Sequence, residues 1–178
     1  MKKSTCLSVA VQAVFTLMCI FLTGIIFYNS IQTAEASSAS SSEVVEIVQD
    51  VAAVVAPNSP ISTATGDDYD ILHDFIRKLA HFSEFAMLGC FLVWAWNAYT
   101  EKKRFLWIPL VLLVAVACAD EILQGFIPGR ATEFMDALLD ISGGIVGGVV
   151  ALLTVWLGTL WIEKMVGVRA LNLKRGKK

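Results

Sequence analysis

Residues 105–127, FLWIPLVLLVAVACADEILQGFI, form one apolar run that carries two adjacent carboxylic acids near its end. A helix needs about 20 predominantly apolar residues to cross a bilayer, and this run has that length. Three further runs of similar length occupy residues 5–28, 79–99 and 137–162. The whole chain is 56% hydrophobic, with a mean hydropathy of +0.66. We therefore predict an all-α fold, a four-helix transmembrane bundle, in a multi-pass protein of the cell membrane.

The basic residues predict how these four spans are oriented. They gather at the N-terminus, in the connection 101–104 and in the tail 163–178. Because Lys and Arg are enriched on the cytoplasmic side, both termini are predicted inside and the segment 29–78 outside. The whole chain, residues 1–178, then forms a single membrane domain with a basic cytoplasmic tail. As an alternative, the first span is a signal peptide cleaved at residues 34–36, which leaves three spans.

The outer segment is predicted to contain one short amphipathic helix at residues 43–56. Its apolar side chains recur at helical spacing. They are Val44, Ile47, Val48, Val51 and Val55. Ser40 and Glu43 have the spacing of a capping box, Pro57 marks the end of the helix, and the serine-rich stretch 37–42 fits a linker. The helix is predicted to pack over the bundle or on the lipid surface, with partner docking as the alternative.

A second helix start lies just before the second span. Asp67, Asp68 and Asp70 are acidic residues close together. Carboxylates are favourable at the positive end of the helix dipole. We therefore expect a helix to begin here and to continue directly into the span 79–99.

Several polar and ionisable residues lie within or beside the last three spans. A charge in the hydrocarbon costs about 3 kcal/mol, so such residues mark a functional site by default. Spacings of three and four residues place them on shared helix faces, and the predicted topology brings them to the outer face in one polar pocket. These candidates are Lys78, His81, Glu84, Asp120, Glu121, Gln124, Arg130, Asp136 and Asp140.

The fourth span carries glycines four residues apart in two adjacent pairs. They are Gly143 with Gly147, and Gly144 with Gly148. Small residues at this spacing let two helix backbones approach closely. We predict packing inside the bundle, with a homo-oligomer through this face as the alternative.

Three strings carry a family resemblance: RKLAHFSEFAMLG at 77–89, ADEILQGFIPGRATEFMDALLDISGGIVGG at 119–148 and, more weakly, FYNSIQ at 27–32. They resemble the VanZ family over essentially the whole chain. The family pattern falls on Lys78, His81, Phe82, Asp120, Glu121, Gln124, Pro128, Gly129, Arg130, Asp136, Gly143 and Gly147. The chain departs by having Phe85 where Tyr is usual and Asp140 where Asn is usual, which adds a carboxylate. The resemblance implies a multi-pass membrane protein of a family whose named member is associated with teicoplanin resistance.

Carboxylates outnumber cations among the candidates, so either some are protonated or a cation or cationic ligand binds. Three hypotheses follow. The first is a pocket that binds or modulates a cell-envelope or lipid-linked ligand and confers glycopeptide (teicoplanin-type) tolerance, with Arg130 and Lys78 suited to a phosphate. The second is a membrane enzyme acting on a lipid-linked substrate by acid/base or metal chemistry. The third is an ion-paired structural or assembly protein without a ligand.

Other ligand classes find less support in the sequence. It shows no Ser or Cys nucleophile signature, and its four cysteines fit packing better than metal ligation or disulfides. One histidine in the cluster is a weak metal signature, so no metal ligands are assigned, and the sequence identifies no cofactor. The short basic tail is explained by topology, so nucleic acid is not an expected partner. The expected partners are membrane lipids and a cell-wall precursor or lipoglycopeptide, in a bacterial plasma membrane.

Overall fold

The computed structural model describes the backbone of residues 2–100, 105–130 and 132–175, and these ranges contain helices and loops without a strand. The helices are α1 (Lys2–Ser30), α2 (Ala34–Val55), α3 (Asp67–Tyr99), α4 (Trp107–Gly125) and α5 (Phe134–Arg175). Four of them, all but α2, are long and apolar enough to cross a membrane. The predicted all-α fold with four spans and one further helix is confirmed.

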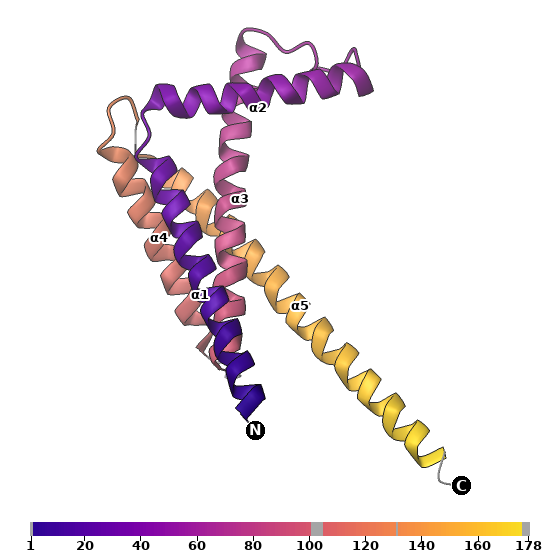
Figure 1. The fold of residues 1–178 in the computed structure, drawn as a ribbon. Helices are drawn as coiled ribbons and strands as arrows, with labels where there is room; N and C mark the ends of the chain where they lie inside the picture. Colours follow the sequence, from indigo (N-terminus) through magenta and orange to yellow (C-terminus); the bar gives the residue numbers. More distant parts are fainter. Residues whose placement is uncertain (1, 101–104, 131, 176–178) are drawn as a thin grey trace.

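Figure 1 shows how the helices are arranged. α1, α3 and α4 run side by side, and α5 crosses them at an angle and continues away from the bundle. α2 lies across one end of the bundle, while α1 begins and α5 ends at the opposite end (Figure 1). This arrangement defines an α2 end of the bundle, where the loops after α1 and α4 also lie.

The start of α2 differs from the sequence prediction. The helix begins at Ala34, with Thr33 as its N-cap accepting a hydrogen bond from the Ala36 backbone N–H at 3.3 Å. The stretch 37–42 is therefore helical and not a linker, and the predicted capping box at Ser40 is wrong. Instead, the Ser40 hydroxyl donates to the Ala36 carbonyl at 3.2 Å, because a serine inside a helix can satisfy itself on the preceding turn.

Two of the spanning helices, α3 and α5, cover the predicted apolar runs and extend beyond them. α3 begins at Asp67 and continues without a break to Tyr99, as expected, and has 33 residues. At 1.5 Å per residue it is about 50 Å long, more than the roughly 30 Å of a bilayer core. Its first turns therefore stand outside the hydrocarbon. α5 begins three residues before the predicted span and continues as a helix to Arg175, so part of the basic tail 163–178 is helical.

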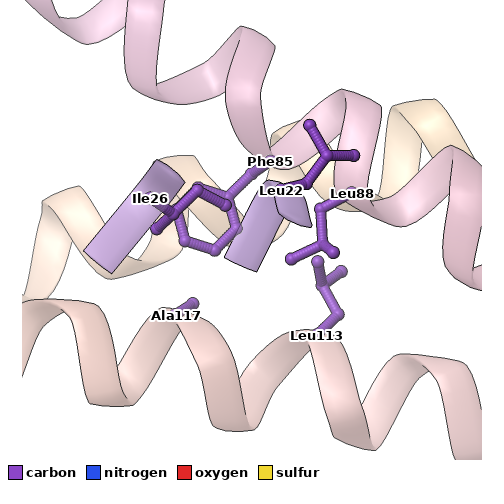
Figure 2. Packing of buried hydrophobic residues seen from close by; sticks show 6 residues of the cluster. All are labelled: Leu22, Ile26, Phe85, Leu88, Leu113 and Ala117. Atoms are coloured by element: carbon purple, nitrogen blue, oxygen red, sulfur yellow. The ribbon is translucent and has the colours of Figure 1, made fainter. Parts of the chain in front are cut away.

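The apolar core of the bundle is small and lies between three helices. Figure 2 shows its six buried side chains pointing toward one another: Leu22, Ile26, Phe85, Leu88, Leu113 and Ala117. Many other large apolar side chains are exposed, among them Phe21 of α1 at 60% and Leu157 of α5 at 55%. In water such a surface would be an aggregation hazard, whereas lipid tails provide it with an apolar solvent.

Glycines set the closest helix contact in the bundle, between α3 and α5. A Cβ at Gly143 would overlap the Phe82 carbonyl, and a Cβ at Gly147 would overlap the Ala86 carbonyl. The backbones of α3 and α5 therefore touch, which only small residues allow. Gly144 faces the side chain of Leu113 in α4 and the backbone of Gly89 in α3, while Gly148 has ordinary van der Waals contacts. This contact lies one turn beyond Asp140 and holds that residue close to α3.

Candidate functional site

A layer of buried polar side chains, with one half-buried histidine, crosses the bundle near its α2 end. Each of the four spanning helices contributes to it: α1 with its last residue, α3 with its middle, α4 with its last two turns and α5 with its second turn. Four of its members are acidic or amide side chains with 6% exposure or less. We call this set the polar layer, and its members are Ser30, His81, Asp120, Glu121, Gln124 and Asp140.

Asp120 is the best-satisfied carboxylate of the polar layer. Its side chain is 0% exposed. One oxygen accepts a hydrogen bond from the Ser30 hydroxyl, and the other accepts one from Gln124 Nε2 at 2.8 Å. Two neutral donors thus hold the carboxylate in one orientation between α1 and α4.

Glu84 connects α3 to α1 one turn away from His81. Its Oε1 accepts a hydrogen bond from Asn29 Nδ2 at 2.7 Å, while its Oε2 is buried without a hydrogen-bond partner. Asn29 and Ser30 were not among the predicted site residues. The only signal for them was the FYNSIQ string at the end of the first span, because neutral polar residues near a membrane surface are unremarkable on their own.

Glu121 fixes the connection between α4 and α5. Its Oε1 accepts a hydrogen bond from the Glu133 backbone N–H at 2.5 Å, directly before the first residue of α5. The favourable position of a carboxylate at a helix N-terminus explains this arrangement. Its Oε2 is buried without a hydrogen-bond partner.

Arg130 lies in the loop between α4 and α5, after Gly129, whose φ of 82° allows the chain to turn. Its Nη1 donates to the Ser30 carbonyl at 3.4 Å. Burial lowers the pKa of Arg130 from its usual value, and the neighbouring Arg77 lowers it further. Within the part of the chain that the structure describes, Arg130 is not ion-paired to Asp136 or Glu121, although an ion-paired structural protein is expected to pair its buried cations with carboxylates.

Lys78 is paired with a carboxylate of its own helix that was not among the predicted site residues. Its Nζ pairs with Asp74 Oδ2 at 2.8 Å, and Arg77 Nη2 pairs with Asp74 Oδ1 at 3.1 Å. These are the only ion pairs among the described residues, and the side chains in them are 37–45% exposed. The buried carboxylates of the polar layer are thus not neutralised by Lys or Arg.

Three cavities with shared lining residues surround the polar layer. The largest, about 420 Å³, lies between α1, α2 and α3 and is lined by Asn29, Arg77, His81 and Glu84, among others. The second, about 340 Å³, is mostly polar. Its charged lining residues are Asp74, Arg77, Arg130, Glu133 and Asp136. The third, about 10 Å³, lies between α3, α4 and α5.

The structure therefore divides the predicted site residues among neighbouring cavities and does not gather them in one pocket. His81 and Glu84 line the largest cavity, and Arg130 and Asp136 line the second. Lys78, His81, Gln124, Asp136 and Asp140 line the third. Arg77 lines all three, although it was not among the predicted site residues.

Three residues of the polar layer have the arrangement of metal ligands. His81, Asp120 and Asp140 each offer one ligand atom, and these atoms lie within 4.8 Å of one another. Among the described side chains, Cys19, Cys90 and Cys118 are free thiols and belong to no such group.

The fold and the buried polar layer define a multi-pass, all-helical membrane protein. The sequence profile of the VanZ/LLP1 family matches residues 15–157, which is most of the chain. The chain therefore belongs to the VanZ/LLP1 family. No curated protein and no solved structure matches it.

Proposed function

We propose that the protein binds a lipid-linked, phosphate-bearing molecule of the cell envelope at the α2 end of the bundle. The observation that carries this proposal is the cavity of about 340 Å³, which both Arg77 and Arg130 line. The planar guanidinium group matches the oxygens of a phosphate with two parallel hydrogen bonds. Two arginines from different elements therefore suit one phosphate or a diphosphate.

The neighbouring cavity suits the lipid part of such a ligand. It has about 420 Å³ and shares Arg77 with the phosphate cavity. Its apolar lining comes from Val44 of α2 and from Ile76, Leu79 and Ala80 of α3. An amphiphile with its phosphate at Arg77 has an apolar wall on which its chain can lie, and this continuity favours a lipid-linked ligand over a free phosphate.

The distribution of basic residues predicts the side of the membrane on which the ligand binds. Lys and Arg predict that the end opposite α2 faces the cytoplasm. The α2 end then faces outward in a bacterial plasma membrane, where cell-wall precursors and lipoglycopeptides are found. Engagement of either molecule would provide tolerance to a teicoplanin-type antibiotic.

The contacts in the polar layer weigh against a purely structural role. A scaffold held by buried ion pairs requires each buried carboxylate to face a cation, because an unpaired buried charge costs several kcal/mol. Among the described residues, Asp120 accepts neutral donors, and Asp140 is paired with no Lys or Arg. This arrangement argues against an ion-paired scaffold and leaves the buried carboxylates free to face a cation.

A binding measurement on the full chain tests the proposal. The protein in lipid nanodiscs is titrated with a short polyprenyl phosphate, and binding is followed by native mass spectrometry. We expect Arg130→Lys, which keeps the charge and loses the two-pronged contact, to weaken binding about 10-fold, equivalent to about 1.4 kcal/mol. Lys164→Gln, an exposed position far along α5, is the control. Equal affinity for the phosphate-free polyprenol, or an unchanged affinity in Arg130→Lys, would contradict the proposal.

A further inference from the structure

Three helices bring together one imidazole and two carboxylates at the centre of the polar layer. His81 comes from α3, Asp120 from α4 and Asp140 from α5. One ligand atom from each lies within 4.8 Å of the other two. Since the three residues are 20 or more positions apart in the chain, their meeting is a product of the tertiary fold.

Asp140 does not have all its hydrogen-bond partners in this arrangement. It is 2% exposed, and its Oδ1 is buried without a hydrogen-bond partner. His81 Nδ1 is also buried without a partner. Buried polar atoms almost always have a hydrogen-bond or metal partner. We therefore expect a bound particle next to these two atoms. Both side chains line the cavity of about 10 Å³ between α3, α4 and α5, which is close to the space that one water-sized particle requires.

We propose that His81, Asp120 and Asp140 form a binding site for one divalent transition-metal ion, with Mn²⁺ and Zn²⁺ as the fitting ions. Two ionised carboxylates and a neutral imidazole around such an ion form a neutral complex. This removes the electrostatic penalty of the two buried carboxylates. Imidazole nitrogen combined with carboxylate oxygen suits this class of ion better than Mg²⁺ or Ca²⁺, which prefer oxygen alone.

The surroundings hold the three ligands in place. Ser30 and Gln124 donate hydrogen bonds to Asp120, the kind of outer contact that orients a metal-binding carboxylate. The glycine contact at Gly143 and Phe82 holds α5 against α3 directly beside Asp140 and His81. With metal–ligand bonds of about 2.1 Å, ligand atoms lie at most about 4.2 Å apart. Side chains that are already within 4.8 Å therefore need only a small inward movement.

An ion with three protein ligands keeps at least one coordination position open. The cavity at the ion shares Arg77, Gln124 and Asp136 with the lining of the phosphate cavity. A phosphate oxygen of a bound ligand can therefore complete the coordination. This last step rests on the function proposed above, whereas the cation site itself does not.

The test uses the metal alone and the full-length protein. Protein purified with a chelator is dialysed against Mn²⁺ or Zn²⁺, and the bound metal is measured by inductively coupled plasma mass spectrometry, with Mn²⁺ also followed by electron paramagnetic resonance. We expect one ion per chain and a higher melting temperature with metal. Asp140→Asn and His81→Gln should each reduce the affinity at least 10-fold. Asp50→Asn, at an exposed carboxylate of α2 that lines none of the three cavities, should bind as the unchanged protein does.

The outcomes separate the cation site from the lipid site. Circular dichroism of the metal-free variants establishes that they are folded, and two independent ligand substitutions keep the test valid if one of them fails to fold. Absence of saturable binding of both ions, or equal loss in Asp50→Asn and Asp140→Asn, overturns the cation site. If metal-free protein still binds polyprenyl phosphate in that case, the proposed function survives without it.

Discussion

A single methyl group at Gly147 should loosen the bundle and move the polar layer. The Cβ of Gly147→Ala would overlap the backbone carbonyl of Ala86, and backbone cannot rotate away as a side chain can. α5 must therefore shift from α3. Overpacking of this kind costs about 1–3 kcal/mol. Gly147 is two turns beyond Asp140 on the same face, so the shift also carries this carboxylate away from His81.

The same helix supplies a matched control for this prediction. A Cβ at Gly158 has nothing within 4 Å, and replacing glycine by alanine in a helix is favourable by about 1 kcal/mol. Because this helix-propensity gain is common to both variants, their difference isolates the contact between α3 and α5. Thermal unfolding in detergent should show Gly147→Ala to be about 1–3 kcal/mol less stable than Gly158→Ala. Equal stability of the two variants would refute the tight helix contact.

Three further predictions concern the membrane orientation, the polar layer and the phenotype. In intact cells and a cysteine-free background, Ser59→Cys should react with a membrane-impermeant thiol reagent and Lys103→Cys should not; the reverse pattern would invert the proposed topology. Ser30→Ala leaves a buried carboxylate oxygen without its donor and should lower stability by about 1–3 kcal/mol in chemical unfolding, whereas the exposed Ser83→Ala should have little effect. Arg130→Lys should accumulate normally yet lose lipoglycopeptide tolerance in a growth assay, and a loss that tracked protein abundance would indicate a scaffold instead.

The spanning helices were predictable because lipid imposes a simple requirement on the sequence. An apolar run of about 20 residues must satisfy its backbone internally, and a helix does so. The continuous helix from Asp67 into the second span followed from its acidic first turn. The start of α2 did not follow, because serines at 37–42 favour linkers and helix caps by local chemistry. The Thr33 cap and the packing of α2 on α3 outweigh this preference.

The residue types of the candidate site were predictable from the sequence, but the contacts between their side chains were less so. The predicted topology brought the candidate residues to one face of the membrane, and the ligand atoms of three of them, His81, Asp120 and Asp140, do lie within 4.8 Å of one another. Residue spacing within one helix does not determine how the neighbouring helices are rotated about their own axes, and so which of their side chains face it. The sequence therefore did not reveal that Ser30 contacts Asp120. Arg77 was overlooked as a lining residue for the same reason. The pairing of Lys78 with Asp74 is an i,i+4 contact within α3, which spacing alone allowed.

The hydrogen bond from Ser30 to Asp120 has a consequence for the biogenesis of the protein. Before the bundle closes, α4 would enter the membrane with Asp120, Glu121 and Gln124 close to lipid, and a carboxylate in hydrocarbon costs about 3 kcal/mol. Ser30 at the end of α1 is synthesised 90 residues before Asp120. Its hydroxyl is therefore already present in the membrane when α4 leaves the ribosome. We expect α4 to insert efficiently only beside α1, which a translocon insertion assay on chains carrying Ser30→Ala would measure. The order of helices along the chain thereby provides Asp120 with a donor from α1 at the moment of its insertion.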